Sequence, residues 1–99
     1  MSTPQEKMDR LVPGAPFGKY IVEKLLGQGG MGAVYLIRHQ LLETLFAMKI
    51  LFPEVEIRNP LFVKRFIREA KLACKIRHPN LIAVHDAGQM EGIYYIIMD

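Results

Sequence analysis

The strongest constraint on this chain is the glycine-rich run at residues 27–32, Gly-Gln-Gly-Gly-Met-Gly, which lies between two segments patterned like β-strands. Residues 19–28 alternate roughly between apolar and polar side chains, and residues 33–39 (AVYLIRH) are rich in β-branched and aromatic ones. The glycines disfavour a helix, because glycine is a poor helix former. Two strands joined by a short glycine-rich turn form a hairpin. We therefore predict a β-hairpin over residues 19–39.

A third strand and a helix are predicted next. Residues 45–51 (LFAMKIL) are largely apolar and contain one lysine, which favours a strand, and residues 53–60 read as a connector. Asn59 followed by Pro60 is typical of a helix start, with the asparagine as N-cap and the proline at the first helical position. Apolar residues recur at helical spacing over residues 61–77, and Pro79 ends the pattern.

Two further strands complete the predicted domain, at residues 81–87 and 93–98, with a turn at 88–92. The order β-β-β-α-β-β defines an α+β fold with a five-stranded antiparallel sheet and one helix. Residues 1–18 contain prolines, small residues and charges, and we expect them to form a flexible leader. The predicted domain therefore spans residues 19–99.

Length, charge and cysteine content exclude several classes of protein. A chain of 99 residues has room for one small domain. The net charge of +3 is mild and no nucleic-acid reader motif accompanies it, so nucleic-acid binding is not expected. No apolar run reaches the length of about 18–20 residues that a membrane segment needs, and no signal peptide is evident. The single cysteine fits a reducing compartment, so we expect a cytoplasmic protein, and no residues have the spacing of a metal site.

The glycine run matches the pattern G-x-G-x-x-G, which is weak evidence when it stands alone. Glycines let the backbone approach phosphates closely and present N–H groups to anionic oxygens. In a dinucleotide-binding turn the glycines lead into a helix, whereas here they lead into a β-rich segment. Strand, glycine loop and strand fit a loop that covers the phosphates of ATP. A plain glycine hairpin without a ligand stays open as an alternative.

Two charged residues stand out in predicted apolar surroundings. Lys49 interrupts an apolar strand, and burying an unpaired ammonium group is costly, so either an anion partner or a head group that reaches solvent is needed. Glu69 lies at the edge of the apolar face of the predicted helix and can supply the carboxylate. The alternative is that Glu69 is solvated, or forms a weak surface pair with Arg65 one turn earlier.

Taken in order, these motifs resemble the N-terminal lobe of a bacterial-type (Hanks-type) serine/threonine protein kinase. The resemblance covers residues 19–99 and rests on five linked motifs, which four stretches carry: YIVEKLLGQGGMGAVYLIRH, FAMKIL, RFIREAKLACKIRHPNLI with its His-Pro-Asn, and YYIIMD. It implies ATP as the nucleotide, a protein substrate phosphorylated on Ser or Thr, and Mg²⁺ held by the other lobe.

The resemblance also implies a role for each matching residue. Lys49 would contact the α- and β-phosphates and pair with Glu69, and these two are the implied catalytic residues. Met98 would be the gatekeeper behind the adenine, Asp99 the first hinge residue, and Val84 part of an apolar stack towards the other lobe. The implied nucleotide-binding residues are Leu26, Gly27, Gln28, Gly29, Gly30, Met31, Gly32, Val34, Ala47, Lys49, Met98 and Asp99. Among these, Leu26, Val34 and Ala47 would sandwich the adenine ring.

The catalytic loop with its Asp and Asn, and the Asp-Phe-Gly that holds magnesium, do not occur in the sequence. We therefore expect a truncated kinase domain that is inactive alone, with its natural function exerted in a longer kinase. An alternative is a free-standing, non-catalytic kinase-like binding module. A dinucleotide-dependent enzyme is a third hypothesis, but it would need a helix after Gly32.

Overall fold

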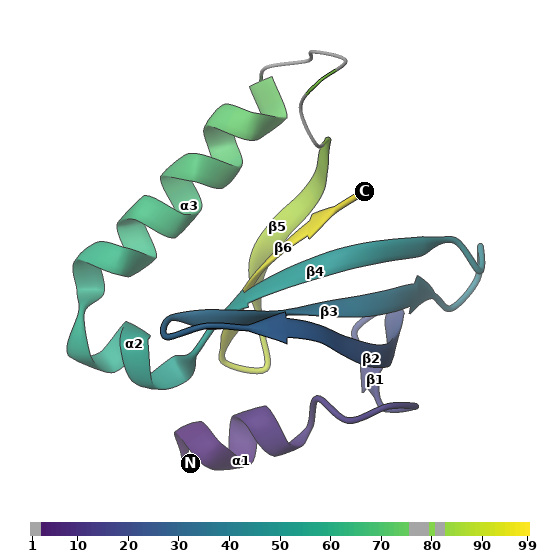
Figure 1. Cartoon of the computed structure of the whole chain (residues 1–99), viewed down its shortest axis with the longest axis horizontal. Coiled ribbons are helices and arrows are strands. Elements are labelled where there is room, and N and C mark those ends of the chain that lie inside the picture. The colour runs from purple at the N-terminus through teal and green to yellow at the C-terminus, as the bar shows by residue number, and fades with distance from the viewer. Residues whose placement is uncertain (1–2, 76–79, 81–82) are drawn as a thin grey trace.

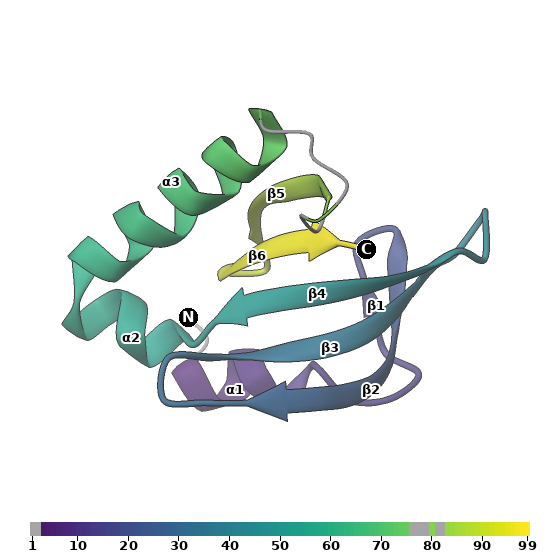
Figure 2. The ribbon, with the colours of Figure 1, turned by 45° about the horizontal axis from the view of Figure 1, so that its top comes forward.

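A computed structural model of the chain describes residues 3–75, 80 and 83–99. The described helices and strands are α1 (Pro4–Asp9), β1 (Pro16–Phe17), β2 (Tyr20–Gln28), β3 (Gly32–His39), β4 (Leu45–Leu51), α2 (Pro53–Arg58), α3 (Pro60–Lys75), β5 (Val84–Met90) and β6 (Ile93–Met98). Their arrangement is an α+β fold built on one curled antiparallel sheet (Figures 1 and 2). No helix in the described part of the chain is long and apolar enough to cross a bilayer.

The sheet contains six strands in the order β1-β2-β3-β4-β6-β5, and every pair is antiparallel. Five of these strands were predicted, and β1 is the additional one. The β2–β3 hairpin has the predicted place, with the glycine run at its tip. The last two strands form the predicted hairpin, but β5 runs from Val84 to Met90 rather than over residues 81–87. Residues 81–82 lie outside the described part of the chain.

The long helix α3 confirms the helical pattern, since Phe66 and Ala70 on its inner face are buried. The helix begins at Pro60, the predicted first helical position, directly after Asn59. Asn59 forms the C-cap of the short helix α2, in a segment predicted to be a connector, and the Asn59 carbonyl accepts a hydrogen bond from the N–H of Phe62. The predicted stop at His78 and Pro79 lies outside the described residues.

The N-terminal segment is more ordered than a flexible leader. Thr3 caps α1 by accepting the N–H of Glu6, and β1 pairs with the start of β2. Leu11 and Phe17 are 6% and 1% exposed, so both belong to the core. Figure 2 shows α1 behind β2 and β3, where Met8 packs against the same core. Residues 3–18 therefore cover one face of the sheet, while a domain boundary at residue 19 stays a prediction.

Two clusters of buried residues hold the fold together. The larger one lies between the sheet and the N-terminal segment and includes Val22, Ile37, Met48, Ile50 and Ile97, each fully buried. The smaller one joins α3 to the sheet: Leu51, Phe66, Ala70 and Ile96. Because side chains alternate along a strand, the residues between those of the large cluster point to the opposite face of the sheet. That opposite face carries the site.

Candidate functional site

The glycine loop, residues 27–32, turns back tightly on itself and is tied to the end of β4. The Gly29 N–H donates a hydrogen bond to the Gly32 carbonyl, and the Phe52 N–H donates one to the Met31 carbonyl, each 2.9 Å long. Gly32 lies opposite Leu51, and a Cβ atom on it would stand 1.9 Å from the Ile50 carbonyl oxygen. Glycine is therefore required at residue 32 by the close approach of two strands.

The other three glycines of the loop have no such structural reason. A Cβ atom on Gly27, Gly29 or Gly30 would meet nothing within 4 Å, and none of these residues has a positive φ. The folded chain itself would accept a side chain at each of them. Their common property is an unobstructed backbone at the tip of the hairpin, where a ligand can come close to N–H groups.

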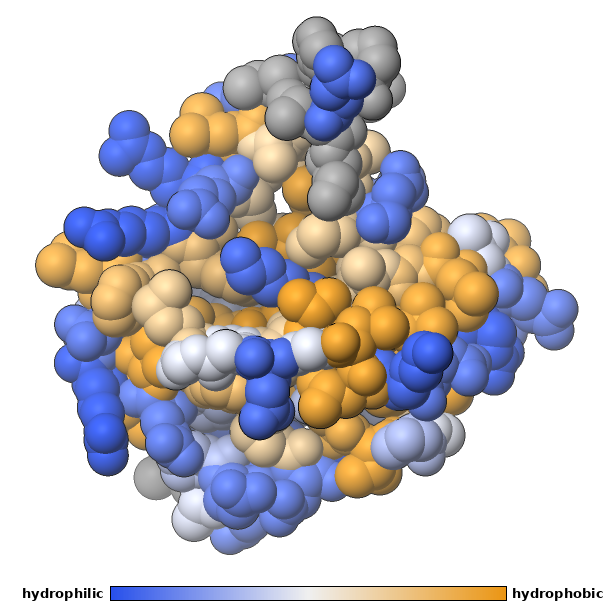
Figure 3. All heavy atoms as spheres, in the orientation of Figure 1, coloured by the Kyte–Doolittle hydropathy of each residue, from blue (hydrophilic) through white to orange (hydrophobic). Residues whose placement is uncertain are grey.

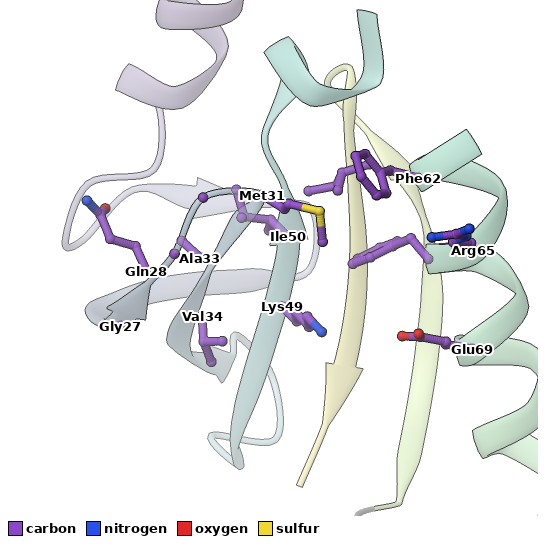
Figure 4. Close-up of a pocket in the computed structure, with 15 residues that line it drawn as sticks. Gly27, Gln28, Met31, Ala33, Val34, Lys49, Ile50, Phe62, Arg65 and Glu69 are labelled. Atoms are coloured by element: carbon purple, nitrogen blue, oxygen red, sulfur yellow. The ribbon is translucent and has the colours of Figure 1, made fainter. Parts of the chain in front are cut away.

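A pocket of about 500 Å³ lies between the glycine loop and α3 (Figure 4). It is lined by Gly27, Gln28, Gly29, Gly30, Met31, Gly32, Ala33, Val34, Lys49, Ile50, Leu51, Phe62, Arg65, Phe66 and Glu69. Most of its surface is apolar, and the charged groups in it are Lys49, Arg65 and Glu69. The glycine-loop pocket thus brings together the loop, the lysine and the glutamate that were predicted from separate parts of the sequence.

The position of Lys49 follows from the alternation of β4. Met48 and Ile50 on either side of it are fully buried, whereas Lys49 is exposed and points to the opposite face. Across the sheet, Lys49 pairs with Val34 of β3, which also lines the pocket. The head group of Lys49 is therefore exposed at a pocket, where solvent reaches it and an anion could do so as well.

Glu69 reaches the same pocket from the other side. It is exposed on α3, next to the buried Ala70, and Figure 4 shows its carboxylate and the Lys49 ammonium pointing towards one another. Among the described residues, Arg38 and Glu23 form an ion pair and His85 contacts Asp99, but Lys49 and Glu69 form no ion pair. Lys49 and Glu69 therefore face each other across an open space in which an anionic ligand would contact the lysine.

Some residues of the pocket were not assigned from the sequence. Phe62, Arg65 and Phe66 join Glu69 on one side of α3, because they lie seven, four and three residues before it. This spacing in the sequence could have identified the three residues, because any ligand beside Glu69 also meets the preceding two turns of the helix. Arg65 was considered only as a surface partner of Glu69, and it is in fact a second cation of the pocket.

Four of the predicted nucleotide-binding residues do not line this pocket. Leu26 is half exposed on β2, and Ala47 lies between Leu36 and Met98 in the sheet. Asp99 follows β6; its N–H donates to the Ala83 carbonyl, and its carboxylate contacts Nε2 of His85. These residues extend the same face of the sheet away from the loop, where Figure 3 shows apolar side chains gathered over β2–β4.

No metal centre is formed by the described residues, because no three of their His, Cys, Asp or Glu side chains come together in a group that could hold an ion. Among the residues that the structure describes, Glu69 is the only carboxylate that lines the pocket. A Mg²⁺ ion usually needs one or two carboxylates together with substrate phosphates and water. Glu69 is therefore one candidate ligand among the described residues of the pocket.

Comparison with known proteins identifies the family. The protein kinase domain model matches residues 20–99. The serine/threonine-protein kinases PknJ and PknF of Mycobacterium tuberculosis are 46% and 40% identical over 88 and 89 residues, which are 89% and 90% of this chain. The kinase domain of PknI from the same organism superposes with a TM-score of 0.74 at 37% identity, covering 90% of this chain.

The chain belongs to the protein kinase family, and it corresponds to the N-terminal lobe of the bacterial-type serine/threonine kinases. It spans only 15% of PknJ, 18% of PknF and 36% of the PknI kinase-domain chain. A structure described as the apo form of PpkA-294 has a TM-score of 0.79 at 23% identity, which supports the fold alone. The sixth strand and the additional helices are variations on the predicted architecture.

Proposed function

We propose that this chain is the ATP-binding small lobe of a serine/threonine protein kinase, which transfers the γ-phosphate of ATP to hydroxyl groups of proteins. The observation that carries the proposal is the convergence of three features on one pocket: a glycine loop with an open backbone, an exposed lysine, and a helix glutamate facing that lysine. The names of the relatives agree with this reaction, although the chain spans less than a fifth of PknJ and of PknF.

The residues present fit a triphosphate. Gly27, Gly29 and Gly30 leave the space above their backbone empty, so phosphate oxygens can reach the N–H groups of the loop. Lys49 offers a cation to the α- and β-phosphates on the opposite wall. Glu69 then pairs with Lys49 and fixes the position of its ammonium group. Bound ATP supplies the phosphoryl group, and these side chains bind and orient it.

The adenine would lie on the apolar face of the sheet beyond the phosphates. Val34 lines the pocket, and Leu26 and Ala47 lie on neighbouring strands, so the three can enclose a flat ring. Met98 ends β6 opposite Ala47 and would limit the depth of the adenine site, with Asp99 at its rim. Gln28 and Met31 would take part through the backbone of the loop.

Phosphoryl transfer would also need groups that this sequence does not contain. A kinase uses an aspartate to accept the hydroxyl proton, and an asparagine and a second aspartate to hold magnesium. We propose that the remainder of the kinase supplies them and that the 99-residue chain alone binds nucleotide weakly without transferring phosphate.

The proposal is tested by measuring transfer of labelled γ-phosphate to a protein substrate, with the complete kinase and with the 99-residue chain. We expect transfer by the complete kinase, its loss on Lys49→Met, and its retention on Lys24→Met, which removes an exposed lysine outside the pocket. The chain alone should give no transfer. A folded complete kinase that neither binds nor hydrolyses ATP would contradict the proposal and favour a non-catalytic binding module.

A further inference from the structure

Met31, in the glycine loop, differs from the other described methionines in its exposure. It is 48% exposed, whereas Met48 is fully buried in the core and Met8, Met90 and Met98 are partly buried. A methionine is oxidised when an oxidant reaches its sulfur atom, so exposure decides which methionine reacts first. Within the part of the chain that the structure describes, Met31 is therefore the methionine most open to oxidation.

The side chain of Met31 also lines the glycine-loop pocket. Its backbone is fixed to the end of β4, because its carbonyl accepts the hydrogen bond from the N–H of Phe52. From this fixed backbone the thioether extends towards Phe62 of α3, as Figure 4 shows. Phe66, one turn further along α3, lines the same pocket. Met31 therefore brings a sulfur atom to the place where the loop faces two aromatic rings of the helix.

The reduced thioether suits these surroundings. It is apolar and polarisable, and sulfur makes favourable contacts with aromatic rings such as those of Phe62 and Phe66. A thioether is also only a weak hydrogen-bond acceptor, so it does not compete for the two cations of the pocket, Lys49 and Arg65. In its reduced form Met31 thus belongs to the apolar wall of the pocket and leaves the cations to a ligand.

We propose that Met31 is an oxidation site, at which hydrogen peroxide converts the thioether to a sulfoxide and thereby weakens nucleotide binding. The sulfur donates an electron pair to one peroxide oxygen, so an S–O bond forms and the O–O bond breaks. The second oxygen leaves as water with both protons of the peroxide. The sulfur is oxidised and the peroxide is reduced, so no further reactant is needed. The effect on binding rests on the proposed function, because it concerns the pocket assigned to ATP.

The sulfoxide would change the pocket in two ways that act in the same direction. Oxidation turns an apolar side chain into a polar one, which no longer suits the aromatic wall of Phe62 and Phe66. The new oxygen carries partial negative charge and accepts hydrogen bonds, so it is attracted to Lys49 and Arg65. It would compete there with the phosphates of ATP. Oxidised Met31 is therefore expected to occupy part of the site that the reduced side chain leaves open.

The test uses the complete kinase, treated with hydrogen peroxide. Peptide mapping by mass spectrometry follows the gain of oxygen at each methionine, and we expect Met31 to react at least fivefold faster than Met48. Calorimetric titration then compares ATP affinity before and after treatment, and the parent should lose at least threefold.

Two variants assign this loss to one residue. In Met31→Leu the ratio of treated to untreated affinity should stay within about 1.5-fold of one, whatever its untreated affinity is. Met90→Leu removes a methionine outside the pocket and should keep the sensitivity of the parent. Methionine sulfoxide reductases, which reverse this modification, should restore the affinity of the treated parent.

Three outcomes would overturn the proposal. The first is oxidation of Met31 no faster than that of Met48. The second is full ATP affinity after complete oxidation of Met31, and the third is an equal loss of affinity in Met31→Leu, which would assign the sensitivity to another residue. Failure of the proposed function looks different: the untreated kinase would not bind ATP, which would also end the claim on affinity, while the mass spectra would still decide whether Met31 is the preferred oxidation site.

Discussion

Val34 of β3 lies directly opposite Lys49 of β4 in the antiparallel sheet, so both side chains project from the same face into the glycine-loop pocket. The pairing places an apolar side chain beside a cation, at the junction between the loop and the apolar face of β2–β4. A ligand with an anionic part and a flat apolar part would satisfy both residues at once. The register of two strands therefore defines what kind of molecule fits the site.

The first prediction concerns the open space between Lys49 and Glu69. Because no ion pair joins them, Lys49→Met and Glu69→Gln should have additive effects on the unfolding free energy of the free chain, within about 0.5 kcal/mol. In the presence of ATP the same two substitutions should show a coupling of roughly 0.5–3 kcal/mol in nucleotide affinity. Urea unfolding and calorimetric titration measure the two quantities. An equally large coupling without nucleotide would show that the residues already pair in the free protein.

The second prediction distinguishes glycines that the fold needs from glycines that a ligand needs. Gly32→Ala should destabilise the protein by roughly 1–3 kcal/mol, because the new Cβ would collide with the Ile50 carbonyl. Gly29→Ala has open space and an ordinary φ, so its stability should stay within about 1 kcal/mol of the parent.

Gly29→Ala should instead weaken the binding of ATP, because its methyl group would stand where the phosphates approach the loop. Thermal unfolding combined with ATP titration checks both glycines. A Gly29→Ala chain that binds ATP like the parent would refute the assignment of this residue to the ligand.

The third prediction concerns Phe17, in the segment that sequence analysis treated as a leader. Its ring is 1% exposed and packs edge-on against Tyr95, with ring centroids 5.6 Å apart. Phe17→Ala should therefore cost about 3–5 kcal/mol of stability. Val12→Ala is a matched control, because Val12 is 49% exposed and should change stability by less than about 0.5 kcal/mol. Chemical denaturation of both variants gives the comparison. If Phe17→Ala were as stable as Val12→Ala, the N-terminal segment would not contribute to the stability of the fold.

The fourth prediction concerns alkaline pH. Burial raises the pKa of Tyr35 above its usual value of 10.0, and burial followed by the nearby Asp86 raises the pKa of Tyr20 and Tyr95 as well. The folded state thus holds these protons more tightly than the unfolded state. Their contribution to stability is fully present below pH 10 and is lost as the pH rises from there through the raised folded-state pKa.

The measurement for this prediction is the unfolding free energy of the parent and of Tyr35→Phe between pH 8 and 11. Above pH 10 the unfolding free energy of Tyr35→Phe should fall less steeply than that of the parent, because one of the three tyrosine hydroxyls with a raised pKa has been removed. Parallel curves for the two proteins would show that Tyr35 does not contribute to the alkaline loss of stability.

Much of the fold was predictable because its signals are local. The alternation in β2, β3 and β4 and the helical spacing around Phe66 each reflect one buried face, and the structure has those elements. Lys49 and the glycine loop stood out because each breaks the pattern of its own surroundings. Their convergence with Glu69 came from the resemblance to kinases, since no local pattern in the sequence fixes a distance between separate elements.

The features that were missed depend on long-range packing. Phe17 follows a proline-containing stretch with no periodicity, and only its contact with Tyr95 on β6 makes it a core residue. The short helix α2 has few residues to reveal a period, and Pro53 reads equally well as a loop residue or as the first residue of a helix. The hollow of about 220 Å³ beside α3 is lined by residues of α3, β5 and β6 together, so it has no counterpart in a linear pattern.

The alternation of β4 places Lys49 between Met48 and Ile50, both fully buried. A shift of this strand by one residue against β3 would turn the lysine into the apolar core and push a core side chain into the pocket. Such a shift is opposed by the full cost of burying a charge and exposing two apolar residues. The packing of the hydrophobic core thus fixes the register of β4, and the same packing that keeps the protein folded also directs Lys49 into the pocket.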